Sequence, residues 1–229
     1  MKSIELLKKL NEKAVFTLSD IRRLSVSKDK DYAKLIVNRL IKRDLIRKVA
    51  RNVYTTKSYI YSIASHITYP SYISFWSASS FLGYTEQILK TIQVVVGRKV
   101  KNVKFDNYLI KFISLKKMYG YKKIQINRGE IFIVEDEKLL IDCFLRYKEM
   151  GNFDEIIKVF EKAEISKEKI IEYLEIERNQ TIIKRVGYLL EKIKKIDISD
   201  KFKLDNNYTV LNPFSKKNKL NSTKWRVKI

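Results

Sequence analysis

The chain has 229 residues, of which 45% are hydrophobic, so it is long and apolar enough for one large domain or two ordinary ones with a packed core. Its formal net charge is +22, no apolar run approaches the length of about eighteen residues expected of a membrane span, and its N-terminus MKSIELLKKL is amphipathic rather than a signal peptide; we therefore expect a cytoplasmic protein without a membrane partner. Cys143 is the only cysteine and His66 the only histidine, which excludes an internal disulfide, a multi-cysteine zinc site and chemistry that needs paired histidines.

The first 43 residues show three helical patterns. Residues 3–12 predict a short amphipathic helix, and a second helix is expected to run from a cap at Thr17 or Ser19 to Leu24, followed by a turn at residues 25–27. The third and best-defined helix opens at Asp29 and ends at about residue 43. Its apolar residues follow the i, i+3, i+4, i+7, i+8 rule, which predicts that they are buried: Ala33, Ile36, Val37, Leu40 and Ile41.

The opposite face of the third helix is polar. Lys34 and Asn38 lie four residues apart and project together, which suits a recognition helix because lysine reaches phosphate or guanine and asparagine pairs with adenine. Apolar and polar residues alternate over residues 45–55, and the pattern then reverses. This predicts a two-stranded wing with its turn near residues 50–52, where Asn52 tolerates a positive φ.

Residues 1–60 carry 16 Lys/Arg against 6 Asp/Glu, a net charge of +10 that is large enough for a phosphate-binding surface. Three helices and a basic hairpin predict a winged helix-turn-helix that binds double-stranded DNA. The alternative is a protein-docking module, although docking alone would not require basic residues on both the helix and the wing. The predicted DNA-binding residues are Lys28, Lys30, Lys34, Asn38, Arg39, Lys42, Arg47, Lys48 and Arg51.

The next segment is rich in aromatic and small residues. Residues 59–64 look helical, and Ser71 or Ser74 is expected to cap a further helix that Gly83 ends. Its apolar residues, from Ile73 to Leu82, are too many for one narrow stripe. They belong either to the core or to a partner-binding surface, and the candidates for partner binding are Tyr72, Phe75, Trp76 and Gln87.

The remainder predicts strands and then helices. Strands are expected at residues 91–96, 108–114, 121–126 and 131–134, with a hairpin at residues 127–129 between the last two, and helices at residues 137–150, 153–161, 166–175 and 178–194. A basic run at residues 216–219 precedes a final strand at residues 224–229.

We therefore predict an α+β protein with two domains. The first is the winged helix-turn-helix of residues 1–60. The second is a larger mixed domain of residues 61–229, with a short β-sheet in its β-rich part (91–135), C-terminal helices in its helical part (136–195) and a basic tail (200–229).

Residues 131–138 imitate a metal-dependent nuclease. A strand followed by Asp136-x-Lys138 is typical of nucleases that hold Mg²⁺ with a second carboxylate, for which Asp106 is available. The pattern is short, however, and we favour a structural interpretation in which Asp136 caps the next helix and Glu137 lies near its positive end. We expect no enzyme activity, no metal and no cofactor.

The order of several segments resembles the AbiEi antitoxin family of abortive-infection systems. The most specific segment is residues 70–87, which run from Pro-Ser-Tyr-Ile-Ser to Thr-Glu-Gln. The shorter matching segments are Arg51-Asn-Val-Tyr54 at the end of the wing, Glu137-Lys-Leu-Leu-Ile-Asp142, Arg185-Val-Gly-Tyr-Leu-Leu-Glu191 and Trp225-Arg-Val227.

This resemblance implies a repressor-antitoxin. The winged helix would bind an inverted repeat in its own promoter, and the larger domain would oppose a toxin resembling a nucleotidyltransferase. The chain departs from the family at Asn52, where members commonly carry glycine, and this costs little if the position is left-handed. Similar proteins also occur without a neighbouring toxin, so the alternative that this chain is a stand-alone transcription factor stays open.

Overall fold

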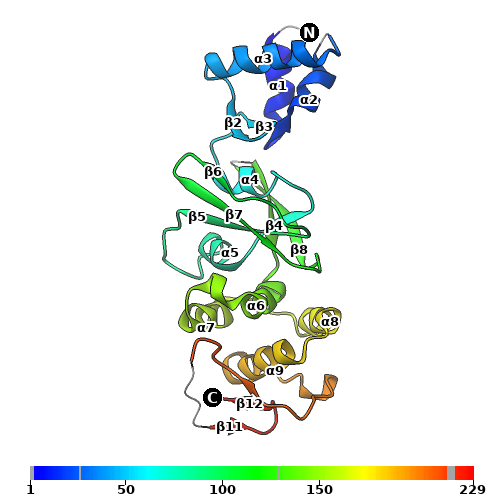
Figure 1. Cartoon of the computed structure of the whole chain (residues 1–229). Coiled ribbons are helices and arrows are strands. Elements are labelled where there is room, and N and C mark those ends of the chain that lie inside the picture. The colour runs from blue at the N-terminus through cyan, green and yellow to red at the C-terminus, as the bar shows by residue number, and fades with distance from the viewer. Residues whose placement is uncertain (1–2, 26, 128, 216–219) are drawn as a thin grey trace. The chain divides into compact units, whose positions relative to one another are not determined.

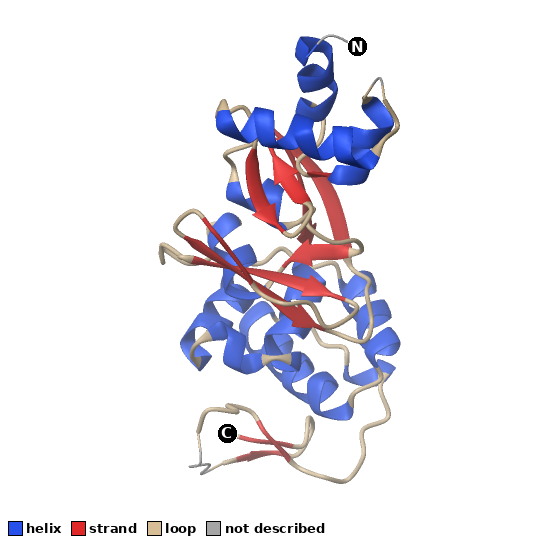
Figure 2. Cartoon of the chain, turned by 45° about the horizontal axis from the view of Figure 1, so that its top comes forward, coloured by secondary structure: helices blue, strands red, loops and turns tan. Residues whose placement is uncertain are grey.

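A computed structural model describes residues 3–25, 27–127, 129–215 and 220–229. Helices and strands are interspersed along the chain (Figures 1 and 2), which confirms the α+β class. Contacts between its residues divide the chain into two compact units. Unit 1 comprises residues 1–73, 90–116 and 123–133, and unit 2 comprises residues 74–89, 117–122 and 134–229. The domain boundary expected at residue 60 stays a prediction, since these units interleave along the chain.

The N-terminal part of unit 1 packs three helices against a small sheet. In chain order its elements are α1 (Ser3–Asn11), β1 (Phe16–Thr17), α2 (Leu18–Leu24), α3 (Lys30–Lys42), β2 (Arg47–Ala50) and β3 (Val53–Thr55). The strands form a sheet in the order β1-β3-β2, in which both neighbouring pairs are antiparallel. Side chains from all these helices and strands meet in one core: Leu6, Leu10, Phe16, Ile21, Ala33, Val37, Leu40, Ile46 and Tyr54.

The helix starts in this part follow the sequence closely. Thr17 forms a capping box with Asp20, because the Thr17 hydroxyl accepts from the Asp20 N–H and the Asp20 carboxylate accepts from the Thr17 N–H at 2.8 Å. Asp29 caps α3 by accepting from the N–H groups of Asp31 and Tyr32, each at 2.8 Å.

The rest of unit 1 is built on a six-stranded sheet with the order β6-β7-β5-β4-β9-β8. Its elements are α4 (Ile60–Ala64), β4 (Ser71–Ile73), β5 (Thr91–Val96), β6 (Val103–Phe105), β7 (Tyr108–Ser114), β8 (Tyr121–Ile126) and β9 (Gly129–Val134). β5 runs parallel to β7 and antiparallel to β4. Successive residues of a strand point to opposite faces of the sheet, and Val94, Val95 and Val96 are all at most 1% exposed, so both faces are covered at β5, as its unbroken apolar run indicates.

Unit 2 is mainly helical. It contains α5 (Phe75–Phe81), α6 (Asp136–Leu145), the 3₁₀ turn η1 (Tyr147–Met150), α7 (Phe153–Lys162), α8 (Lys167–Glu177), α9 (Gln180–Leu189), the π turn η2 (Leu190–Lys194) and the 3₁₀ turn η3 (Ser199–Lys201). Its last segment forms β10 (Thr209–Val210), β11 (Asn221–Ser222) and β12 (Val227–Lys228), in the order β10-β12-β11. The β12 segment lies beside α9 in Figure 1.

The prediction of a helix that begins at Ser71 or Ser74 and ends at Gly83 is partly wrong. Ser71 does not cap a helix, because residues 71–73 form β4, and Tyr72 and Ile73 are fully buried between β5 and β9. Pairing on both sides outweighs the local helical pattern. The helix starts at Phe75 and ends before Gly83, whose φ of +76° confirms its role as a terminator.

Other elements differ less. Strand β6 and the C-terminal sheet were not expected, and the predicted final strand over 224–229 is limited to Val227–Lys228. The expected turn at Val26, the hairpin position Arg128 and the basic run at 216–219 lie outside the described residues. In the described part of the chain, no helix is both long enough and apolar enough to cross a membrane.

A close contact in unit 2 gives a stability test. A Cβ at Gly187 of α9 would overlap the ring of Trp225, which is 1% exposed. Replacing glycine by alanine ordinarily stabilises a helix by about 1 kcal/mol, but overpacking should make Gly187→Ala lower the free energy of unfolding by about 1–3 kcal/mol. Both tryptophans, Trp76 and Trp225, lie in unit 2, so urea unfolding followed by tryptophan fluorescence measures this effect. A stabilised variant would contradict the packing.

Candidate nucleic-acid interface

Helix α3 has one buried face and one exposed face. Ala33, Val37 and Leu40 are at most 5% exposed and pack into the core. The opposite side carries the polar residues, and it is open to solvent along the whole helix. The N-cap keeps the start of this face charged, because the backbone N–H groups of Tyr32 and Asp31 lower the pKa of the Asp29 carboxyl.

The β2–β3 hairpin presents a second set of cations. Asn52 lies in its turn with a φ of +60°, so the left-handed position expected from the sequence is confirmed. Lys48 of β2 and Arg51 of the turn, which both precede this residue, are exposed. The core residues Ile46, Val49 and Tyr54 hold the hairpin against the domain and leave its basic residues on the outside.

The nine residues predicted to bind DNA fall into two groups. Six are exposed and have no hydrogen bond or ion pair through their side chains to any described residue: Lys30, Asn38, Arg39, Lys42, Lys48 and Arg51. We call these six residues the free polar surface. The other three, Lys28, Lys34 and Arg47, already have partners inside the protein.

The partners of Lys28 and Lys34 occupy hydrogen-bond donors that these side chains would otherwise present to a ligand. The Lys28 ammonium donates to the Arg23 carbonyl at the end of α2, and Lys34 Nζ lies 2.7 Å from Asp31 Oδ1. The hydrogen bond to Asp31 raises the pKa of Lys34, which keeps it charged. Because both members of the Lys34–Asp31 pair are exposed, its contribution to stability is small.

Arg47 has a structural role that the sequence did not predict. Its Nη1 lies 2.6 Å from Asp106 Oδ2 beside β6, and its Nη2 donates to the Lys57 carbonyl at 2.6 Å. The guanidinium also lies over the ring of Phe105, at 4.9 Å from its centroid. Arg47 therefore holds the hairpin against β6, and its predicted contact with the DNA backbone stays a prediction.

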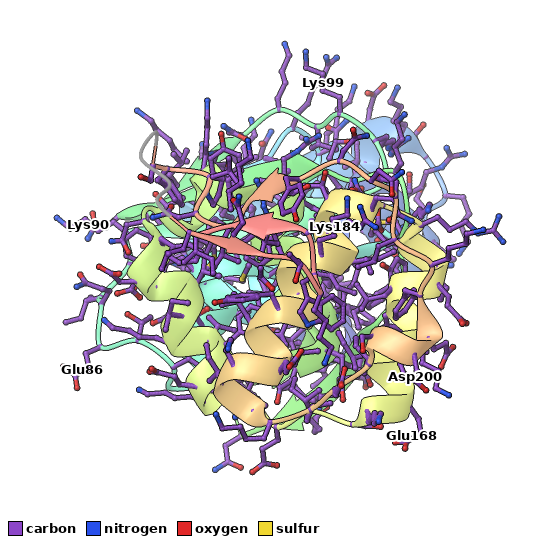
Figure 3. The ribbon with its side chains drawn as sticks, turned by 90° about the horizontal axis from the view of Figure 1, so that it is seen from below. Glu86, Lys90, Lys99, Glu168, Lys184 and Asp200 are labelled. Atoms are coloured by element: carbon purple, nitrogen blue, oxygen red, sulfur yellow. The ribbon has the colours of Figure 1, made fainter. Side chains whose placement is uncertain are left out.

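The charge of unit 1 extends beyond the helices. Unit 1 holds 25 Lys/Arg against 8 Asp/Glu, or +17, whereas unit 2 holds 23 against 18, or +5. Part of the excess lies on the β5–β6 connection and β6, where Arg98, Lys99, Lys101 and Lys104 are exposed without a partner among the described residues. In Figure 3 the Lys99 side chain projects away from the ribbon. The excess of 11 Lys/Arg over 4 Asp/Glu in residues 61–135 was the sequence signal for this cluster.

The predicted partner-binding residues divide by burial. Tyr72 and Phe75 are 0% exposed and belong to the packed interior, so they offer no surface to a partner. Trp76 is half-buried, and its ring packs within 3 Å of the position that a Cβ at Gly151 would take. Gln87 alone is exposed. The aromatic residues therefore fit the core interpretation better than the binding one.

The geometry does not assemble the nuclease pattern. Lys138 is fully buried and bonds through its ammonium to Asp142, one turn later in α6. Asp136 Oδ1 accepts from the Tyr84 hydroxyl at 2.9 Å and its Oδ2 from the Glu164 N–H at 3.1 Å. Among the described residues, no group of three or more His, Cys, Asp or Glu side chains could hold a metal ion.

Lys138 and Asp142 form the centre of a buried polar cluster in unit 2. Ser74 Oγ donates to Asp142 Oδ2 at 2.7 Å, so the serine at the start of α5 ties that helix to α6. The Lys138 ammonium lies 4.6 Å from the centroid of the Tyr119 ring. Ser74, Lys138 and Asp142 are all 0% exposed, which makes the cluster structural.

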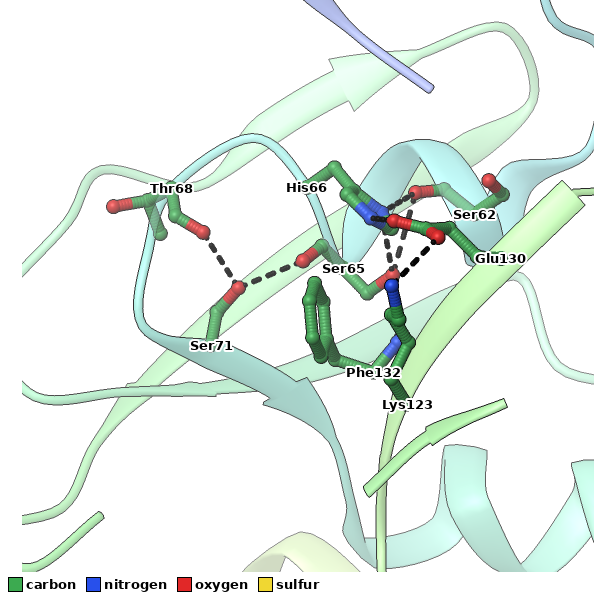
Figure 4. Close-up of polar contacts among 8 residues, drawn as sticks. All are labelled: Ser62, Ser65, His66, Thr68, Ser71, Lys123, Glu130 and Phe132. Carbon is green, nitrogen blue, oxygen red and sulfur yellow. Dashed lines mark hydrogen bonds and ion pairs between the residues drawn. The ribbon is translucent and has the colours of Figure 1, made fainter. Parts of the chain in front are cut away.

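A second polar cluster surrounds the only histidine (Figure 4). His66 Nδ1 lies 2.8 Å from the Ser62 carbonyl, and Nε2 lies 3.2 Å from Glu130 Oε1. Burial opposes the charge on Glu130, but hydrogen bonds from His66 and Lys123 outweigh it and lower its pKa. Ser65 Oγ is 3.1 Å from Nδ1, but Ser65 is 1% exposed, so this serine–histidine–glutamate series has no accessible nucleophile.

The buried ion pair of α6 gives a test of its structural role. Lys138→Met should lower the free energy of unfolding by about 3–5 kcal/mol, because Asp142 stays buried without its counter-charge. The control is Lys9→Met, which breaks a pair of the same spacing on the surface of α1, where the Lys9–Glu5 distance is 3.8 Å, and should cost at most about 0.5 kcal/mol. Urea unfolding followed by circular dichroism compares the two, and equal effects would contradict the buried pair.

Comparison of the chain with models of protein families gives no match, and neither does comparison with curated proteins. The resemblance to AbiEi antitoxins therefore depends on the short segments quoted from the sequence. In the structure, Lys138 and Asp142 of one such segment and Trp225 of another are buried, so their positions follow from packing.

Proposed function

We propose that the protein is a DNA-binding transcription regulator whose first sixty residues act as a winged helix-turn-helix. The observation that carries this proposal is the free polar surface, whose cations lie on α3 and on the β2–β3 hairpin of one small domain. The element order α1-β1-α2-α3-β2-β3 and the strand order β1-β3-β2 support the assignment, because they place a hairpin directly after the third helix.

In this proposal α3 enters the major groove. Asn38 on its exposed face supplies the amide that pairs with adenine, while Lys30, Arg39 and Lys42 are placed to reach phosphates or guanine. Lys48 and Arg51 of the hairpin contact the phosphate backbone beside the groove. Arg47 also positions this hairpin through its ion pair with Asp106.

The second half of the proposal is the antitoxin role. The AbiEi resemblance supports repression of the protein's own promoter at an inverted repeat and opposition to a nucleotidyltransferase-like toxin. The +17 charge of unit 1 and the nearly balanced charge of unit 2 support a division of labour in which unit 1 binds the polyanion.

The DNA-binding proposal predicts a salt-dependent affinity that specific cations control. Replacing both Lys48 and Arg51 by glutamine should weaken binding to all duplexes alike and reduce the slope of log K against log salt by about 2, since each lost phosphate contact removes about 0.9. Fluorescence anisotropy with a labelled duplex between about 50 and 200 mM KCl measures this slope.

The matched control replaces Lys8 and Lys9 by glutamine. These residues are also exposed cations, but they lie on α1, outside the free polar surface. Their removal lowers the net charge equally and should leave the slope nearly unchanged. If both double variants change the slope by the same amount, binding depends on net charge alone and the assigned interface is wrong.

The antitoxin role predicts a separable activity. Cells that express a nucleotidyltransferase-like protein from a neighbouring gene should survive when the full chain is co-expressed. The variant lacking the Lys48 and Arg51 charges should still rescue growth but lose repression of a promoter reporter, because DNA contact and toxin opposition are assigned to different parts. Repression without rescue would support a stand-alone transcription factor, and toxin binding without repression would support a docking module.

A further inference from the structure

We propose that Leu35 determines part of the DNA sequence preference by contacting the C5-methyl group of a thymine in the major groove. This inference rests on the proposed function of α3. Leu35 is 52% exposed, although it lies in the middle of a helix with a complete buried face of its own. At the centre of a recognition face, this apolar side chain can contact an apolar group of the ligand.

The helix geometry places Leu35 opposite the core. With about 100° of rotation per residue, Leu35 lies roughly 160° around the axis from the buried Val37. Asp31, four residues earlier, and Asn38, three residues later, are its neighbours on the same face. Leu35 therefore lies beside the asparagine that is proposed to pair with adenine.

The cations near Leu35 indicate which kind of ligand covers this side chain. Arg39 lies one turn after Leu35 and Lys42 one further turn along the helix, and both are exposed without partners among the described residues. Such cations favour a polyanion over an apolar protein surface. Within the major groove of DNA, the thymine methyl is the group that offers apolar contact, because the other base edges present donors and acceptors.

The energy of such a contact is modest but measurable. Burying one methyl-sized group contributes about as much as one CH₂ group, which corresponds to a roughly four-fold change in affinity. Because Leu35 is not part of the core cluster, its replacement should leave the fold intact. Leu35 thus acts on DNA sequence preference and not on the stability of the domain.

The test uses the full-length protein and a duplex selected from a random-sequence pool. Each thymine of the selected duplex is replaced singly by deoxyuridine, which removes only the methyl group, and affinity is measured by fluorescence anisotropy. At one thymine, or at its symmetry mate in an inverted repeat, the replacement should weaken binding of the natural protein about four-fold. Binding by Leu35→Ala should be weaker than that of the natural protein and insensitive to this replacement.

Two further variants complete the test. Leu35→Gln keeps the length of the side chain without its apolar end and should also be insensitive to the methyl group. Ile4→Ala removes an apolar side chain that is 70% exposed on α1, and it should retain the natural response. Circular dichroism checks that each variant is folded.

Three results would overturn the inference. If no thymine replacement separates the natural protein from Leu35→Ala, Leu35 does not read a methyl group, while the proposed DNA binding stands. If Leu35→Ala instead dissociates a dimer in size-exclusion chromatography with DNA affinity unchanged, the residue contacts protein. A pool that yields no bound duplex overturns the proposed function and this inference together.

Discussion

The burial of one face of α3 is the interaction on which the candidate interface depends. Ala33, Val37 and Leu40 are inserted between side chains of α1, α2 and the small sheet. Since a helix with one fixed face also has its opposite face fixed, this packing determines that Leu35, Asn38 and the cations of α3 point outward. The Asp29 cap adds to this, because it sets the residue at which the helix starts.

A different constraint organises unit 2. There, charged groups are neutralised inside the protein, and the Lys138–Asp142 pair joins Ser74 in a fully buried cluster between α5 and α6. Leaving one partner of a buried ion pair alone is far more costly than keeping both. Such a constraint fixes lysine and aspartate at a spacing of four residues, which explains on structural grounds the lysine of the Asp136-x-Lys138 pattern.

The sequence predicted the elements whose signals are local. Thr17 and Asp29 cap helices through neighbouring N–H groups, and Asn52 adopts its turn conformation within the hairpin. Strand β4 could not be predicted in this way, since Tyr72 and Ile73 become strand residues only through pairing with β5 and β9, which are distant in the chain. The exposure of Asn38 followed from periodicity, whereas the pairing of Arg47 with Asp106 depends on a contact across 59 residues.

Charges that are buried and paired, as in unit 2, and cations that are exposed and unpaired, as in unit 1, affect the stability of the protein differently. In unit 2 a lysine such as Lys184 is buried and held by Asp205 at 2.5 Å, so its charge is balanced in the free protein (Figure 3). In unit 1 the cations of α3 and the hairpin face solvent and repel one another, which opposes the compact state. A ligand that binds only the folded state adds to its stability, and a polyanion would also remove this repulsion. The unpaired cations of unit 1 are therefore a cost to the free protein that binding to DNA would offset.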